Sequence, residues 1–330
     1  MTYQKKQTGF SLIELMIAML LGLLIMAGLV NLFLQSKRSF NQNESIARMQ
    51  EDARFALETI VTDVSMAGML TDLLTPVGIG FDTTLAIGVD CGPGGVPNWA
   101  FSMVNPAGDY ATLELVDNAT SATANAAHSC IAVADIRPGT DILTVKRVAG
   151  RAEPAPEAGR VYLRTNGTAG LLFTEPVSGA PPVNVPVPFQ DWEYLPVIYY
   201  VQNYAFAVGD GIPTLCRKTL SPAGGASSMT TECLARGVEN MQIEFGIDTD
   251  NDGSANVYLA APLANQMSQV VSAKIYLLVR SEESDLSYLN DKVYTLSNAP
   301  AYTPNDNFYR RTFSTTVGVR NLRNLNRLGL

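Results

Sequence analysis

The chain has 330 residues, of which 47% are hydrophobic and 16% are charged, and its formal net charge is −8. This length and composition are typical of a folded protein with one large or two small domains, and they exclude a mostly disordered chain. The negative charge argues against nucleic acid as the main partner, because phosphate binding requires a basic surface.

The N-terminus combines a short basic leader with a membrane-type segment. Residues 1–9 read MTYQKKQTG, and no charged residue occurs between Leu15 and Leu34. About 20 residues at about 1.5 Å each cross roughly one bilayer core. The apolar run is longer than that of a secretory signal peptide, and no A-x-A-like site ends it. We therefore expect a leader over 1–9 and a transmembrane helix over 10–34. The leader lysines favour a cytoplasmic N-terminus, although basic residues also follow the span.

One acid, Glu14, lies at the head of the apolar segment. An unpaired acid inside a bilayer costs at least about 2.5 kcal/mol, so such residues usually have a partner. If the chain is cleaved behind Gly9, the new amine of Phe10 is a cation at a similar depth. Glu14 of one subunit can then pair with Phe10 of the next. The alternative is that Glu14 extends to the lipid headgroups near the cytoplasmic end.

The string GFSLIEL, from Gly9 to Leu15, closely resembles the processing site of type IV prepilins. The resemblance rests on the basic leader, the G-F-[ST]-L-x-E pattern and the apolar run that follows at once. It implies that prepilin peptidase cuts after Gly9 and methylates the new N-terminal residue, Phe10, to N-methylphenylalanine. It also implies that Glu14 guides assembly into a filament.

The helical pattern continues beyond the membrane segment. From Phe40 to Ala67, apolar residues recur at helical spacing and charged residues fill much of the rest. No proline occurs before Pro76, so a single helix of about 60 residues, roughly 90 Å long, is expected. Residues 35–70 are therefore predicted to be an amphipathic continuation of the transmembrane helix.

Four cysteines are present, Cys91, Cys130, Cys216 and Cys233. An even number in an exported chain indicates two disulfides, and no pair has the C-x-x-C spacing of a zinc or redox site. Three pairings are possible. We favour the neighbours in sequence, Cys91–Cys130 and Cys216–Cys233, because short loops close at the lowest entropic cost. In a reducing compartment, four unpaired buried thiols would be the better interpretation.

Residues 71–330 are expected to form a β-rich globular domain in the periplasm or outside the cell. Residues 68–140 are rich in Gly, Ala, Thr, Ser and Asn, which predicts loops with a short strand near 113–116. The prolines of 155–188 predict exposed extended loops. Segments that alternate or are rich in Val, Ile and Tyr predict further strands. These are Asp141–Val148, Arg160–Leu163, Tyr194–Gln202, Met241–Ile247, Gln269–Arg280 and Arg311–Val319.

The expected fold class is α+β and pilin-like. A long N-terminal helix, half in the membrane and half amphipathic, packs on an antiparallel β-sheet domain with loop-rich, disulfide-bearing insertions.

No catalytic constellation is evident. The single histidine, His128, lies in an Ala/Ser/Asn-rich stretch and is expected to be a surface or loop residue. No nucleophile elbow and no phosphate-binding glycine loop occur. The chain is therefore predicted not to be an enzyme, and no cofactor is expected to be required.

One segment has the pattern of a metal loop. Asp248, Asp250 and Asp252, followed by Gly253, match positions 1, 3, 5 and 6 of a calcium loop. The Ser254 carbonyl and Asn256 would stand at positions 7 and 9, but position 12 is Leu259 and not the bidentate glutamate. Calcium is the one candidate cofactor. The alternative is a hydrophilic hairpin turn, where Asp, Asn and Gly are common.

The C-terminal thirty residues are basic. Five arginines, Arg310, Arg311, Arg320, Arg323 and Arg327, stand against a single acid, Asp306. The simple interpretation is a solvated end. The alternative is an electrostatic contact with an acidic face of a neighbouring subunit.

The layout as a whole resembles the PilW family of type IV pilus minor pilins. The supporting features are the helix segment DARFALETIVTDVSMAGM, the cysteine-bearing insert, the string FGIDTDNDG and a strand ending LVRS. The resemblance implies a minor pilin that primes assembly and sits at the tip of a pilus serving twitching motility, adhesion or DNA uptake. It implies membrane lipid, other minor pilins, major pilin, a tip adhesin, prepilin peptidase and the inner-membrane assembly platform as partners. The inner membrane is the expected location before assembly, and the pilus afterwards.

Two alternatives remain open. A minor pseudopilin of type II secretion shares the leader, the helix and Glu14. A membrane-anchored periplasmic binding protein or hydrolase would share only the anchor, and the absence of catalytic residues weakens that hypothesis.

Overall fold

The computed structural model describes residues 9–73, 76, 78–82, 85–96, 98–103, 111–175, 185–223 and 226–322. The predicted leader residues 1–8, part of the proline-rich stretch (176–184) and the arginines Arg323 and Arg327 lie outside these residues. The chain divides into two units, Met1–Arg48 and Met49–Leu330. The boundary falls within the first helix, and each unit is described by itself.

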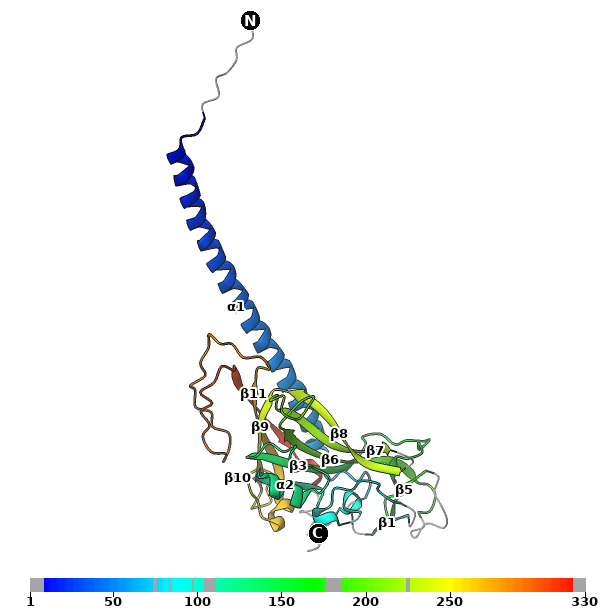
Figure 1. Ribbon diagram of the computed structural model, residues 1–330. Helices are drawn as coiled ribbons and strands as arrows, with labels where there is room; N and C mark the ends of the chain where they lie inside the picture. The colour runs from blue at the N-terminus through cyan, green and yellow to red at the C-terminus, as the bar shows by residue number, and fades with distance from the viewer. Residues whose placement is uncertain are drawn as a thin grey trace. The chain divides into compact units, whose positions relative to one another are not determined.

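The long N-terminal helix is present as α1 (Leu12–Ser65), which is 54 residues long (Figure 1). Its first part belongs to the first unit and meets the length and composition of a membrane span, with none of the apolar window buried within the chain. The helix ends at Ser65, and Gly68 follows with a left-handed φ of 71°. Glycine adopts this conformation without strain, which makes it the usual residue just past a helix end.

In the second unit, α1 buries one stripe of side chains. Met49, Ala53, Ala56, Ile60 and Val64 are all buried and are spaced three or four residues apart. This spacing places them on one face of the helix. The amphipathic continuation predicted from the sequence thus has a real packing face.

The larger sheet contains eight strands within the described residues, in the order β1-β5-β4-β6-β3-β2, with β7 on β6 and β8 on β7. The long strand β6 lies at the centre of this sheet. It pairs with β4 along its first part and with β3 and β7 further on. All pairs are antiparallel except β1–β5. The strands are β1 (Ile79–Phe81), β2 (Leu113–Ala119), β3 (Thr140–Val148), β4 (Val161–Thr165), β5 (Gly170–Thr174), β6 (Gln190–Gln202), β7 (Thr214–Ala223) and β8 (Ala226–Arg236).

The smaller sheet is antiparallel and has the order β10-β9-β11-β12. Its strands are β9 (Val238–Ile247), β10 (Val257–Leu259), β11 (Val270–Arg280) and β12 (Arg310–Gly318). The predicted α+β class and antiparallel β-sheet domain are confirmed, and the described strands form two sheets. The change of sheet occurs at Gly237, whose φ is 77° and where a Cβ would lie 2.4 Å from the Arg280 carbonyl oxygen. Only glycine permits this tight connection.

The two sheets are joined by a buried carboxylate. Asp141 of β3 accepts hydrogen bonds from the backbone N–H of Asn118 (2.8 Å) and of Ile243 in β9 (2.7 Å). Burial raises its pKa to about 7, and Asp117 adds to the rise, although the two N–H donors act in the opposite direction.

The main core lies on the larger sheet. Tyr194, Ile198 and Tyr200 of β6 pack with Trp99 and Phe101. The short helices are α2 (Ser121–Ala127), η1 (Pro93–Gly95), η2 (Trp99–Phe101) and η3 (Ala264–Gln269). The 68–140 stretch thus contains short helices as well as the predicted loops and strand.

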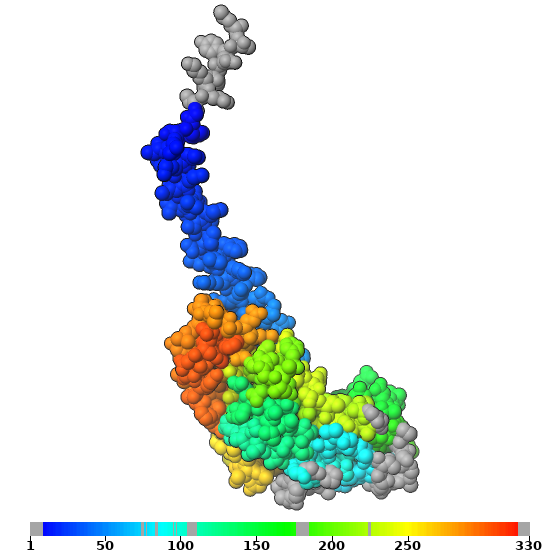
Figure 2. All heavy atoms as spheres, viewed as in Figure 1, coloured from blue at the N-terminus to red at the C-terminus, as the bar shows by residue number. Residues whose placement is uncertain are grey.

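A separate cluster fixes the long segment between β11 and β12. Leu278 of β11 packs with Tyr294 and Leu296 from this segment. Figure 2 shows the segment as the orange surface of the second unit.

Candidate functional site

The predicted processing site lies at the start of α1. Gly9 and Phe10 precede the first helical residue, and the Phe10 side chain is 91% exposed. Glu14 stands in the first turn, where its Oε2 accepts a hydrogen bond from the Ser11 backbone N–H at 3.0 Å. The first N–H groups of a helix lack partners within the helix and carry partial positive charge, so a carboxylate is favoured there. Gly9, Phe10 and Glu14 are all exposed, so the predicted cleavage after Gly9 and the predicted role of Glu14 are compatible with this geometry.

The predicted calcium ligands lie together in the loop between β9 and β10. One carboxylate oxygen from each of Asp248, Asp250 and Asp252 lies within 4.8 Å of the others. Asp248 is 3% exposed, whereas Asp250 and Asp252 are exposed. The loop turns at Asn251 (φ 61°) and Gly253 (φ 93°), as the sequence DNDG favours.

Asn256 acts differently from the expected loop position 9. The Asn256 Oδ1 accepts from the N–H and the hydroxyl of Thr249 (2.7 and 3.0 Å), and its Nδ2 donates to Asp250 Oδ2 at 3.3 Å. Asn256 therefore orients Asp250 and does not present a free oxygen. Ser254 donates its backbone N–H to Asp252 Oδ1 at 2.6 Å, and the role of its carbonyl stays a prediction.

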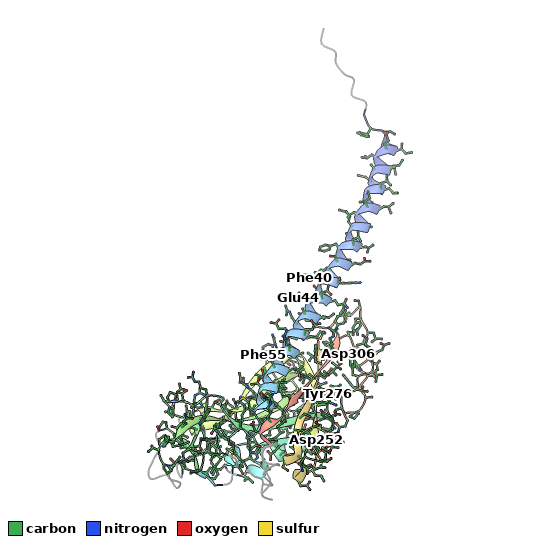
Figure 3. All side chains as sticks on the ribbon, turned by 180° about the vertical axis from the view of Figure 1, so that it is seen from behind. Phe40, Glu44, Phe55, Asp252, Tyr276 and Asp306 are labelled. Atoms are coloured by element: carbon green, nitrogen blue, oxygen red, sulfur yellow. A yellow bond between two sulfur atoms is a disulfide. The ribbon has the colours of Figure 1, made fainter. Side chains whose placement is uncertain are left out.

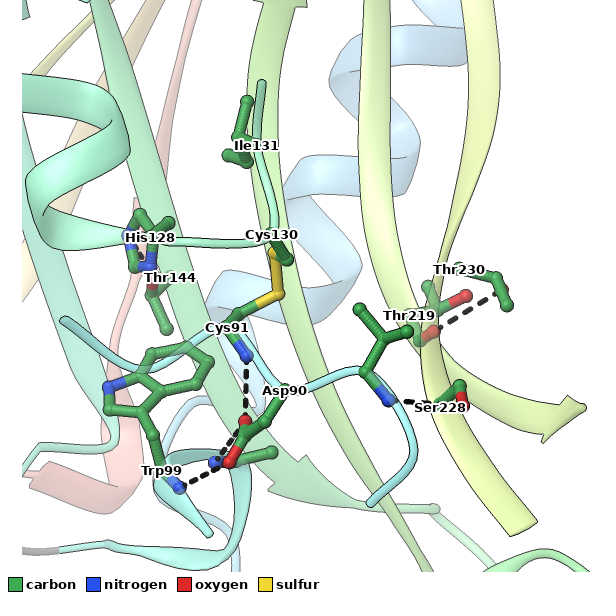
Figure 4. The surroundings of a disulfide bond; sticks show 12 residues. Asp90, Cys91, Trp99, His128, Cys130, Ile131, Thr144, Thr219, Ser228 and Thr230 are labelled. Atoms are coloured by element: carbon green, nitrogen blue, oxygen red, sulfur yellow. Dashed lines mark hydrogen bonds between the residues drawn. A yellow bond between two sulfur atoms is a disulfide. The ribbon is translucent and has the colours of Figure 1, made fainter. Parts of the chain in front are cut away.

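The cysteines form two disulfides, Cys91–Cys130 and Cys216–Cys233, which is the pairing favoured from the sequence. Cys91 is held by its neighbour, since Asp90 accepts hydrogen bonds from the N–H groups of Cys91 (2.7 Å) and Trp99 (2.8 Å) (Figure 4). The second disulfide joins the facing residues of β7 and β8. The first thus fixes an irregular segment, and the second reinforces an existing strand pair.

His128 lies in the loop just after α2, as the prediction of a surface or loop residue allows, but it is buried, with 3% of its surface exposed, so the surface part of that prediction is wrong. Its ring meets Trp99 edge-on, and its Nε2 lies 3.3 Å from the Thr144 hydroxyl (Figure 4). Burial lowers its pKa to about 4, and the charge of Lys146 acts in the same direction. The imidazole is therefore neutral at pH 7 and belongs to the core of the cysteine-bearing insert.

The structure also brings the predicted basic end together with two charges that the sequence does not single out, Glu239 and Arg137. Arg310 of β12 is buried and contacts Glu239 of β9 (2.5 Å) and Asp306 (2.6 Å), while Arg137 contacts the same Glu239 at 2.9 Å. The interpretation of a solvated basic end is therefore wrong for Arg310, whereas Arg311 and Arg320 are exposed. Figure 3 places Asp306 and Asp252 near opposite ends of the smaller sheet, so the ion-pair cluster and the acidic loop are separate features.

Two family models match the chain. The prokaryotic N-terminal methylation motif matches residues 4–30, and the family described as type IV pilus-assembly protein W matches residues 198–321. The two matches support a type IV pilus minor pilin of the PilW family. No curated protein and no solved structure matches it.

The two matches cover the features that matter most for this minor pilin. The methylation motif includes Gly9, Phe10 and Glu14, and together with the apolar helix it indicates membrane anchoring and incorporation into a pilus. The PilW match runs from the second half of β6 to just beyond β12. It therefore includes the Cys216–Cys233 disulfide, the acidic loop and the buried Arg310. Because it names a pilus-assembly family, it favours the type IV pilus over the type II secretion pseudopilus.

Proposed function

We propose that this minor pilin primes assembly of the type IV pilus and sits at its tip. The observation that supports this most is the exposed apolar part of α1, which follows Phe10 and carries Glu14 in its first turn. Because none of this span is buried within the chain, lipid must cover it before assembly and the helices of other subunits must cover it in the filament.

Processing prepares the chain for that transfer. Prepilin peptidase cuts between Gly9 and Phe10 and methylates the new amine. Glu14 of the incoming subunit then pairs with the Phe10 amine of its neighbour, which removes two charges from the apolar environment at once. The N-terminus is cytoplasmic before assembly, and the disulfide-bearing unit is periplasmic, where its cysteines oxidise.

The second unit supports a place at the end of the filament. It has two sheets and a long segment, residues 281–309, that leaves three large apolar side chains, Leu286, Leu289 and Val293, more than half exposed. A bulky subunit at a filament end has to fit only one set of neighbours. Other minor pilins, major pilin and a tip adhesin are the partners proposed for it, and the inner-membrane platform for its insertion.

We propose no catalytic role. The chain's single histidine is neutral and buried against Trp99 and Thr144, which supports a structural part for it.

The test is the amount of surface pili sheared from cells that lack the gene, beside a complemented strain. A priming subunit predicts that pili are lost or sharply reduced and return on complementation. Normal pili in the deletion strain would refute the priming role.

A further inference from the structure

The loop between β9 and β10 gathers negative charge. The carboxylates of Asp248, Asp250 and Asp252 lie within 4.8 Å of one another, and within the described residues no ion pair neutralises them. Like charges at this distance repel each other. Hydrogen bonds from within the loop reach all three carboxylates, and a bound cation would offset the repulsion that remains.

The decisive feature is Asp248, because it is almost completely buried. One of its oxygens, Oδ2, accepts the Gly253 backbone N–H at 2.7 Å. The other, Oδ1, is buried and has no hydrogen-bond partner among the described residues. A buried acceptor of this kind is costly, and a bound cation would satisfy it.

The base of the loop holds Asp248 in place. Its own N–H donates to the Gln269 carbonyl at 2.9 Å, and the N–H of Asn256 donates to the Ile247 carbonyl at 2.9 Å. Ile247 itself is fully buried and is paired with both β10 and β11. The first carboxylate is thus fixed to the sheet, while Asn256 orients the second.

We infer that these three aspartates form a calcium site of this minor pilin. Carboxylate oxygens suit hard cations, and the group contains no histidine or cysteine that would favour zinc or copper. Calcium accepts an irregular shell of carboxylates and waters, whereas magnesium requires a near-ideal octahedron. Because Asp250 and Asp252 are exposed, water completes the shell, and the expected Kd is about 10⁻⁴ to 10⁻³ M, as in extracellular calcium modules.

A bound cation would stiffen the whole segment from Asp248 to Gln269. This part of the chain contains β10 and η3 and is joined at its ends by the hydrogen bond between these two residues. A cation bound by Asp248, Asp250 and Asp252 restrains the turn at the start of this segment. Calcium is therefore expected to protect residues 248–269 from proteolysis.

The test is calorimetric titration of the full chain in detergent micelles, after treatment with a chelator, first with CaCl₂ and then with MgCl₂. The site predicts one saturable calcium event per chain and weaker binding of magnesium. Asp250→Asn and Asp252→Asn change exposed residues, so folding is not at risk, and each should weaken calcium binding about tenfold or more. Asp291→Asn, which removes an exposed acid from the 281–309 segment, should leave it unchanged.

Two results would overturn the proposal. One is the absence of saturable heat up to several millimolar calcium in the wild-type chain. The other is calcium binding of equal strength in the wild type and in the Asp250→Asn, Asp252→Asn double variant. As a second measurement, millimolar calcium should slow protease cleavage within 248–269 in the wild type and in Asp291→Asn, but not in the double variant. Equal cleavage rates with and without calcium in the wild type would also count against the site.

Discussion

Asp63 of α1 and Arg147 of β3 form a buried ion pair, with 2.5 Å between the Arg147 Nη2 and the Asp63 Oδ1, that joins the packed half of the helix to the larger sheet. The Arg147 Nε also donates to the same oxygen at 2.9 Å, and the Tyr199 hydroxyl donates to the Asp63 Oδ2. The side chains of Asp63 and Arg147 are 4% and 12% exposed. Every oxygen of the buried carboxylate thus has a donor, which is the condition under which a buried charge is tolerated.

The first prediction concerns this pair. Asp63→Ala leaves Arg147 buried without its partner, and loss of one member of a buried pair costs about 3–5 kcal/mol. We expect the free energy of unfolding, measured with urea, to fall by about that amount. Glu58→Gln is the matched control in the same helix, because its pair with Arg54 is exposed and such pairs contribute about 0.5 kcal/mol or less. Equal effects of the two changes would contradict the assignment of Asp63 as the anchor of α1.

The second prediction follows from the low pKa of His128, which burial brings to about 4. In the unfolded chain the His128 imidazole binds a proton near pH 6.5, whereas in the folded state it stays neutral until a much lower pH. The stability due to neutral His128 is therefore complete above pH 6.5 and is lost as the pH falls towards 4, at no more than about 1.4 kcal/mol per pH unit. His128→Gln removes this titration, so the wild type should lose stability relative to the variant across this range. A difference that does not change with pH would refute the prediction.

The third prediction has the opposite sign and concerns Asp141. Burial raises its pKa to about 7, above the ordinary value of about 3.9, so the folded state binds a proton that the unfolded chain has released. Its contribution to stability is complete below about pH 4 and is lost as the pH rises through 7. The wild type should thus gain stability relative to Asp141→Asn as the pH falls from 7 to 4. Parallel stability curves for the two proteins would show that Asp141 does not titrate in this range.

The fourth prediction concerns assembly. Glu14→Gln keeps the shape of the side chain but removes the charge that is proposed to pair with the Phe10 amine of a neighbouring subunit. In a deletion strain, this variant should restore severalfold fewer surface pili than the wild-type gene, at equal amounts of protein in the membrane. Glu44→Gln is the control, because Glu44 is an exposed acid further along the same helix that pairs with Arg48. Full restoration by Glu14→Gln would exclude the proposed pairing.

The predictable parts of the fold are those where hydrophobic pattern decides the structure. The uncharged run before Lys37 and the apolar stripe from Met49 to Val64 predict α1, and the apolar strand β3 is predicted with nearly its observed bounds. Strands β7 and β8 are missed because Ser, Thr and charged residues dominate them. Their stability comes from pairing with β6 and with each other, and pairing over long range is not visible in a local pattern.

The candidate sites divide in the same way. The N-terminal motif and the acidic loop are local strings, so their residues can be named from the sequence. The buried positions of Arg310, Asp141 and His128 depend on which strands become neighbours. Glu239, which neutralises Arg310, lies 71 residues away, and no local signal connects the two.

The central claim is that this chain is processed at Gly9 and built into a pilus. It is tested most directly by mass spectrometry of the pili sheared from cells and purified. The account predicts an N-terminal peptide that begins at Phe10 with a methylated amine, together with peptides from the disulfide-bearing unit. A chain that keeps residues 1–9, or that is found in the membrane fraction and not in the purified pili, would contradict it.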